Sequence, residues 1–97
     1  SGPGYVFYLM EGMVDAAVAT GLAPQTAIRL VIQTFLGAAH LAKTSEDSLS
    51  RLREKVTSPG GTTAAGLGML EKLGVKRAIQ KGVDAAYRRS MELGKPD

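Results

Sequence analysis

Cysteine and tryptophan are absent from this sequence, and three tyrosines and two phenylalanines supply its only aromatic rings. The absence of cysteine excludes disulfides, thiolate metal ligands and a cysteine nucleophile. It also fits a cytoplasmic protein, which is the location that we expect. With so few rings, the core must depend on smaller side chains. Alanine and glycine are abundant instead, and they suit closely packed helices better than a large aromatic core.

Long hydrophobic runs are also missing. Glu11 and Asp15 interrupt the first apolar stretch, and Arg29 and Gln33 interrupt the second, so we expect no membrane-spanning helix. The segment Ser1–Tyr5 has no basic region of the kind that opens a signal peptide. The formal net charge of +3 and the pI near 9.5 allow a helix-rich nucleic-acid binder as one alternative. Because the basic residues are spread along the chain without a stripe or reader motif, we expect no nucleic-acid partner.

Strand-like alternation is missing as well, whereas helical spacing recurs throughout residues 1–97. The sequence therefore predicts a single all-α domain of five helices. They are predicted to span residues 3–20, 24–43, 48–56, 62 or 63 to 73, and 75–93. Proline opens the first two helices, and Gly21, Gly74 and Gly94 end the first, fourth and fifth. Pro59 ends the third helix, because proline lacks an amide donor and disfavours helical geometry at the preceding residue.

The predicted helices have more apolar surface than one small domain can cover. In the first helix, Tyr8, Glu11 and Asp15 form one narrow polar stripe, and nearly every other residue is apolar. The second and fifth helices also have apolar faces, which comprise Ile28, Val31, Ile32, Phe35, Leu36, Ala39 and Leu41, and the predicted inward residues Ile79, Val83, Ala86 and Tyr87. A helix that is apolar on most sides is normally buried on most sides. We therefore expect the chain to form a dimer.

The strongest helix breakers stand together in the stretch VTSPGGTTAAGL, residues 56–67. Pro59 fixes the chain direction, Gly60 and Gly61 permit close approach to the backbone, and Thr62 or Thr63 is predicted to cap a new helix. The free amides and the positive dipole end of that helix would suit a carboxylate or a phosphate. On composition alone, an ordinary connection between helices is the more common interpretation. The stretch is not a P-loop, because it lacks the lysine and the preceding strand.

These residues and their flanks resemble a known family. SLSRLREKVTSPGGTTAAGLGMLEKLG is similar to the signature of pyrroline-5-carboxylate reductase, the last enzyme of proline biosynthesis. SGPGYVFYLMEGMVDAAVATGL, AIRLVIQTFLGAAHLA and AIQKGVDAAYRRSMELGK resemble the first, second and last helices of its C-terminal domain. The resemblance covers essentially the whole chain. It departs at His40, where lysine is more usual, and at Gly4, where alanine is common.

The resemblance implies an oxidoreductase domain of the 6-phosphogluconate dehydrogenase C-terminal type, which forms an interleaved helical homodimer. It also implies an N-terminal Rossmann domain that binds NADPH or NADH. Residues 1–97 would then be only the dimerisation and substrate-binding domain of a longer enzyme, since the chain begins without Met at the start of the helical domain. We predict no cofactor-binding or metal-binding residue here, and no activity for this domain alone.

The implied reaction is hydride transfer to 1-pyrroline-5-carboxylate, which gives L-proline. The residues predicted to bind the substrate are Ser58, Gly60, Gly61, Thr62 and Thr63. By the resemblance, Thr63 would be the catalytic residue, with its hydroxyl bonded to the ring nitrogen. Thr62 would contribute mainly its backbone.

Other polar residues need no ligand. His40, Glu11 and Asp15 fit ordinary helix faces, and Arg88 and Arg89 oppose the negative end of the last helix dipole. A helical oligomerisation module without a ligand remains the alternative function.

Overall fold

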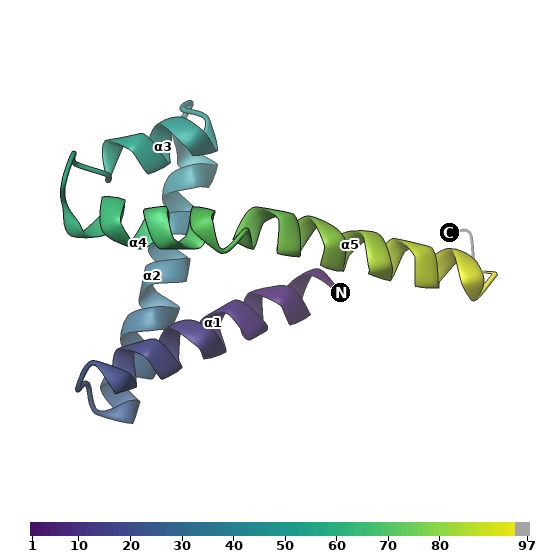
Figure 1. The fold of residues 1–97 in the computed structure, drawn as a ribbon, viewed down its shortest axis with the longest axis horizontal. Helices are drawn as coiled ribbons and strands as arrows, with labels where there is room; N and C mark the ends of the chain where they lie inside the picture. The colour runs from purple at the N-terminus through teal and green to yellow at the C-terminus, as the bar shows by residue number, and fades with distance from the viewer. Residues whose placement is uncertain (95–97) are drawn as a thin grey trace. The chain divides into compact units, whose positions relative to one another are not determined.

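The computed structural model describes residues 1–94, and its five helices run in the predicted order (Figure 1). They are α1 (Gly2–Ala19), α2 (Pro24–Thr44), α3 (Leu49–Lys55), α4 (Thr62–Lys72) and α5 (Val75–Glu92). No strand occurs among these 94 residues. The all-α fold is therefore confirmed, and each helix border lies within one residue of its predicted place. Contacts divide the chain into two units, Ser1–Leu49 and a second that begins at Ser50.

In the first unit, a glycine turn separates α1 from α2. The amide of Leu22 donates to the carbonyl of Ala17 at 3.2 Å, and the amide of Gly21 donates to the carbonyl of Val18 at 3.0 Å. This pair of bonds is a Schellman motif, which needs a left-handed residue at its centre. Gly21 supplies that residue with a φ of 113°. Pro24 then opens α2 in its first turn, as predicted.

The α1–α2 hairpin has a thin core. Its buried side chains are Ala27, which is 0% exposed, and Val31, which is 6% exposed. Half-buried residues at helical spacing surround them, namely Met10, Val14 and Ala17 of α1 and Phe35 of α2. The small Ala27 side chain lets the two helices approach closely. Most of the apolar face predicted for α2 remains exposed, including Ile28, Ile32, Leu36 and Leu41.

In the second unit, Gly74 separates α4 from α5. It is left-handed, with a φ of 72°, and its amide donates to the carbonyl of Glu71 at 3.1 Å. Its own carbonyl accepts the amide of Ala78 at 3.0 Å, which begins α5. Three of the four α5 residues predicted to point inward are exposed instead: Ile79, Val83 and Tyr87. That prediction is wrong for the chain by itself, because no element within residues 50–94 covers this face.

The structure also bears on the predicted partners. None of the helices within residues 1–94 is both long and apolar enough to cross a membrane.

Candidate functional site

The stretch between α3 and α4 is a tight turn formed by Ser58, Pro59, Gly60 and Gly61. The amide of Gly61 donates to the carbonyl of Ser58 at 3.0 Å, and Gly60 has a φ of 71°. Proline at the second position and a left-handed glycine at the third are the marks of a type II turn. The Ser-Pro-Gly-Gly sequence therefore specifies this geometry locally, and α4 begins directly after it.

The start of α4 leaves several amides without partners. The carbonyl of Gly61 accepts the first helical bond, from Ala65 at 3.1 Å, so Gly61 is the N-cap residue. Among the described residues, the amides of Thr62, Thr63 and Ala64 make no backbone hydrogen bond and no side chain caps them. Free amides at the positive end of a helix dipole favour an anion. The turn is thus followed directly by a helix start with free amides, which are the groups that an anion site would use.

The prediction that a threonine caps α4 is wrong. The extended residue before the helix is Gly61, with a φ of −85° and a ψ of −178°, and Thr62 is already helical. The last residue of the type II turn, Gly61, is itself extended, and the helix begins directly after it. The hydroxyls of Thr62 and Thr63 are therefore not used as caps. Both residues are exposed, and among residues 1–94 neither side chain makes a hydrogen bond.

All five predicted substrate residues lie in this one segment. Ser58 and Gly60 are exposed, like Thr62 and Thr63, while Gly61 is half-buried. Gly61 approaches Ser58 closely, since a Cβ at Gly61 would lie 3.0 Å from Ser58 Oγ. The segment therefore offers two chemical features side by side, which are free amides for an anion and hydroxyls that can donate or accept a hydrogen bond.

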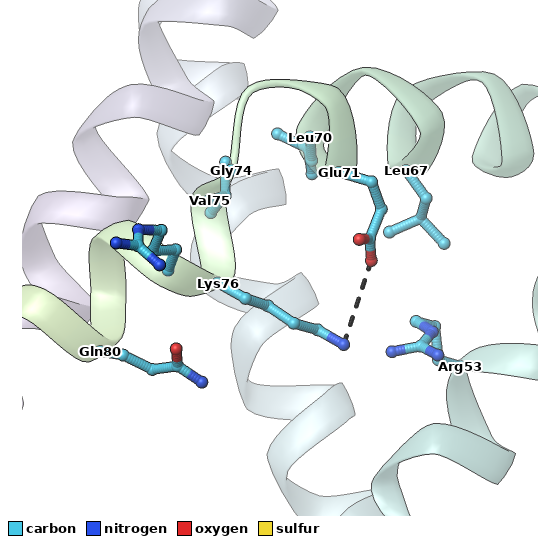
Figure 2. Close-up of a pocket in the computed structure, with 9 residues that line it drawn as sticks. Arg53, Leu67, Leu70, Glu71, Gly74, Val75, Lys76 and Gln80 are labelled. Carbon is cyan, nitrogen blue, oxygen red and sulfur yellow. Dashed lines mark ion pairs between the residues drawn. The ribbon is translucent and has the colours of Figure 1, made fainter.

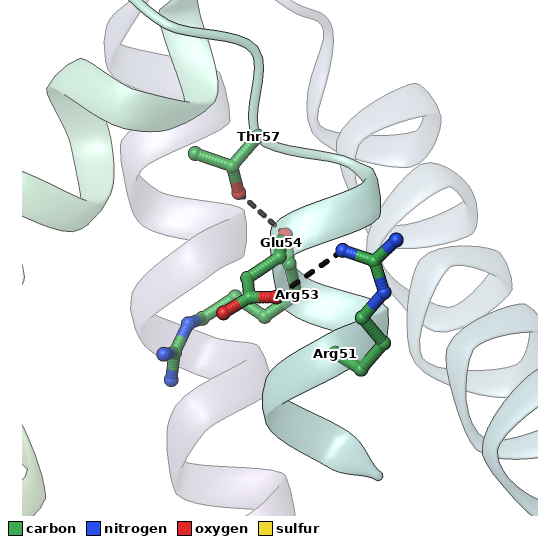
Figure 3. A network of polar contacts seen from close by, with 4 residues as sticks. All are labelled: Arg51, Arg53, Glu54 and Thr57. Atoms are coloured by element: carbon green, nitrogen blue, oxygen red, sulfur yellow. Dashed lines mark hydrogen bonds and ion pairs between the residues drawn. The ribbon is translucent and has the colours of Figure 1, made fainter. Parts of the chain in front are cut away.

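One residue that the sequence analysis missed is Thr57, directly before the turn (Figure 3). It is half-buried, and its hydroxyl donates to the carbonyl of Arg53 at 2.6 Å. In the same helix, an exposed ion pair joins Arg51 to Glu54 at 3.3 Å. The signal available in the sequence was a threonine just after a short helix, because a threonine hydroxyl can bond to the backbone carbonyl four residues before it.

The second unit also contains a cavity of about 380 Å³, at the junction of α4 and α5 (Figure 2). It is lined by Arg53, Leu67, Leu70, Glu71, Gly74, Val75, Lys76, Arg77 and Gln80. Lys76 points toward Glu71, and their charged atoms lie 4.0 Å apart. Both side chains are exposed, and such ion pairs contribute little to stability. None of the predicted substrate residues lines this cavity, so it is separate from the candidate site.

Comparison with known proteins decides the family. Residues 1–93 match the family model described as pyrroline-5-carboxylate reductase dimerisation. The chain belongs to this family. Among its relatives, the pyrroline-5-carboxylate reductase of Synechocystis sp. is 50% identical over 95 residues, which are 98% of this chain and 36% of that protein. The one from Pseudomonas aeruginosa is 45% identical over 93 residues, or 96% of this chain and 34% of that protein.

Solved structures of pyrroline-5-carboxylate reductases have the same fold. Plasmodium falciparum pyrroline carboxylate reductase with NADP bound superposes with a TM-score of 0.94 at 37% identity, over 97% of this chain and 38% of that one. The enzyme from Coxiella burnetii gives a TM-score of 0.93 at 44% identity, over 96% of this chain and 34% of that one. The resemblance found in the sequence is thus confirmed. The chain spans about a third of the length of the curated relatives that it matches.

The polar residues to which the sequence analysis gave no ligand lie outside the candidate site. Arg88 pairs with Asp84 at 3.0 Å, and Arg89 pairs with Glu92 at 3.0 Å, both on the surface of α5. His40, Glu11 and Asp15 are exposed on α2 and α1. Within the described part of the chain, no group of three or more histidine or acidic side chains could hold a metal ion.

Proposed function

We propose that this chain is the dimerisation and substrate-binding part of a pyrroline-5-carboxylate reductase, which reduces 1-pyrroline-5-carboxylate to L-proline with NADPH or NADH. The observation that carries the proposal is the family match over residues 1–93. The names of the relatives give the same activity. Because those relatives are about three times longer than the matched region, the complete enzyme performs the reaction and this chain supplies part of its site.

The substrate is a five-membered ring with one carboxylate and one imine nitrogen. We place its carboxylate on the free amides of Thr62 and Thr63, directly after Gly61, where the positive end of the helix dipole favours an anion. The exposed hydroxyl of Ser58 adds a further donor, and the positive φ of Gly60 turns the chain so that these groups converge. The segment thereby fixes the position of the ring.

Thr63 is then the side chain nearest the reacting bond. Its hydroxyl accepts a hydrogen bond from the protonated ring nitrogen, and it holds the imine in the charge state that accepts hydride. The reduced nicotinamide supplies that hydride when bound. No strand precedes a glycine-rich turn within residues 1–94, so we assign the cofactor to no residue of this chain.

The proposed biological unit is a homodimer of interleaved helical domains, in a cytoplasmic enzyme. Family membership supports the dimer, since the family is defined by dimerisation. The lack of cysteine supports a reducing compartment.

Substitution of the two threonines in the complete enzyme tests the site. Thr63→Ala is expected to lower kcat by about 10²–10³-fold, because a contact that stabilises developing charge is lost. Thr62→Ala, which keeps the backbone amide, is the matched control and should stay within a few-fold of wild type. The measurement is steady-state reduction of pyrroline-5-carboxylate. Turnover near the wild-type value in Thr63→Ala would contradict the role assigned to its hydroxyl.

The second candidate is a helical oligomerisation module without a ligand, which is favoured by the small number of buried residues, Ala27 and Val31 among residues 1–94. A titration with L-proline separates the two. Shifts of the amide resonances of Gly60 to Thr63 support the substrate site, whereas a spectrum without changes in that segment supports the module.

A further inference from the structure

Thr57 connects the end of α3 to the turn Ser58–Gly61. Its hydroxyl donates to the carbonyl of Arg53 at 2.6 Å, and its amide donates to the carbonyl of Glu54 at 3.1 Å. Because α3 has only seven residues, most of its carbonyls lack an intrahelical donor. Thr57 donates to two of these carbonyls, of which that of Arg53 also accepts the amide of Val56 at 3.3 Å. Thr57 is half-buried, while the three residues after it are exposed.

From Thr57, backbone hydrogen bonds lead onward to α4. Ser58 follows Thr57 directly, and its carbonyl accepts the amide of Gly61 at 3.0 Å. The carbonyl of Gly61 then accepts the amide of Ala65 at 3.1 Å. The direction in which the chain leaves Thr57 therefore determines where the free amides at the start of α4 lie, together with the hydroxyl of Thr63.

We propose that Thr57 is a positioning residue for the reductase reaction. Through its bond to Arg53, the Thr57 hydroxyl fixes the exit from α3, and so it aligns the carboxylate-binding amides with Thr63. The hydroxyl of Thr57 is already bonded to α3 (Figure 3), and so is its amide, so the residue acts through the turn. This inference rests on the proposed function.

The test is the pair Thr57→Val and Thr57→Ser in the complete enzyme. Valine keeps the shape of threonine and removes the hydroxyl, whereas serine keeps the hydroxyl. Thr57→Val is expected to lower kcat/KM for pyrroline-5-carboxylate on the order of 10–100-fold, since a displacement near 1 Å in an active site can cost about 100-fold. The loss should include a raised KM for the imine and an unchanged KM for the nicotinamide cofactor. Thr57→Ser should recover most of it.

Thr34→Val is the matched control. The Thr34 hydroxyl donates to the carbonyl of Leu30 at 2.7 Å, which is the same bond four residues back, but it lies in the middle of α2. This variant loses an equivalent hydrogen bond without touching the turn. Its two KM values should equal those of the wild type.

Amide hydrogen exchange gives a readout besides activity. In Thr57→Val, the amides of Gly61 and Ala65 should exchange faster than in the wild type, and in Thr34→Val they should not. Wild-type exchange together with a wild-type KM for the imine in Thr57→Val would overturn the inference. So would a lower kcat with both KM values unchanged, because that pattern indicates less folded enzyme. A wild-type enzyme that does not reduce pyrroline-5-carboxylate overturns the proposed function itself, and the positioning role with it.

Discussion

Gly60 and Gly61 are adjacent residues that require glycine for different physical reasons. Gly60 has a φ of 71°, a conformation that is strained for any residue with a Cβ. Gly61 has an ordinary φ of −85°, but a Cβ there would lie 3.0 Å from Ser58 Oγ and 3.2 Å from Ser58 O. An alanine at Gly60 would thus be strained by the backbone conformation itself, whereas an alanine at Gly61 would be strained partly by a neighbouring side chain.

This difference predicts how alanine substitutions combine with Ser58→Ala. Gly60→Ala should lower the free energy of unfolding by about 1–2 kcal/mol, and Ser58→Ala should not recover it. Gly61→Ala should also destabilise, and Ser58→Ala should recover part of that loss by removing Oγ. The remainder persists because the Ser58 carbonyl oxygen stays in place. Urea unfolding of the single and double variants measures both cycles. Equal recovery in the two backgrounds would contradict the assignment.

The sequence allowed prediction of this turn because proline and glycine impose geometry locally. It did not reveal that Gly61 rather than a threonine would cap α4, since that depends on where the turn ends. Nor did it reveal Thr57, because its partner is the carbonyl of Arg53, and backbone carbonyls have no sequence signature. The five predicted substrate residues fall in one segment only because they are neighbours in the chain.

At the scale of helices, the borders were predictable and the buried faces were not. Pro24, Gly21 and Gly74 act on their own neighbours, so α1, α2, α4 and α5 begin or end where punctuation places them. Burial depends on which other element covers a face. In α5, the apolar stripe that includes Val83 predicts a buried face, but within this chain Val83 is 49% exposed.

The best covered position in the α1–α2 hairpin is Ala27, and it predicts a size limit. Ala27→Leu adds three carbons where no space is left, and overpacking of this kind costs about 1–3 kcal/mol. Ala39→Leu is the matched control, because Ala39 lies exposed on the same helix. Chemical denaturation should separate the two variants. A stability of Ala27→Leu equal to that of Ala39→Leu would mean that the helices are free to move apart.

At the scale of the whole molecule, the exposed apolar faces indicate that a partner covers them. Large apolar side chains remain exposed on α1, α2 and α5, including Phe7, Leu36 and Tyr87 at 61–64%. Helix faces as apolar as these are usually covered by a partner. The matching family model is described as pyrroline-5-carboxylate reductase dimerisation, so the partner that we propose is a second copy of this chain. In the proposed dimer, the apolar face of α5 that was predicted to point inward belongs to a core that two chains build together.

A dimer predicts that stability depends on protein concentration, because only the associated form is folded with its faces covered. The thermal midpoint should rise with concentration, and sedimentation at micromolar concentration should give the mass of a dimer. Leu36→Asp places a charge on the exposed face of α2 and should shift the equilibrium toward monomer. Gln33→Asp adds the same charge on the same helix at an already polar position, and it should remain dimeric. A wild-type chain that sediments as a monomer, with a midpoint independent of concentration, would contradict association through these faces.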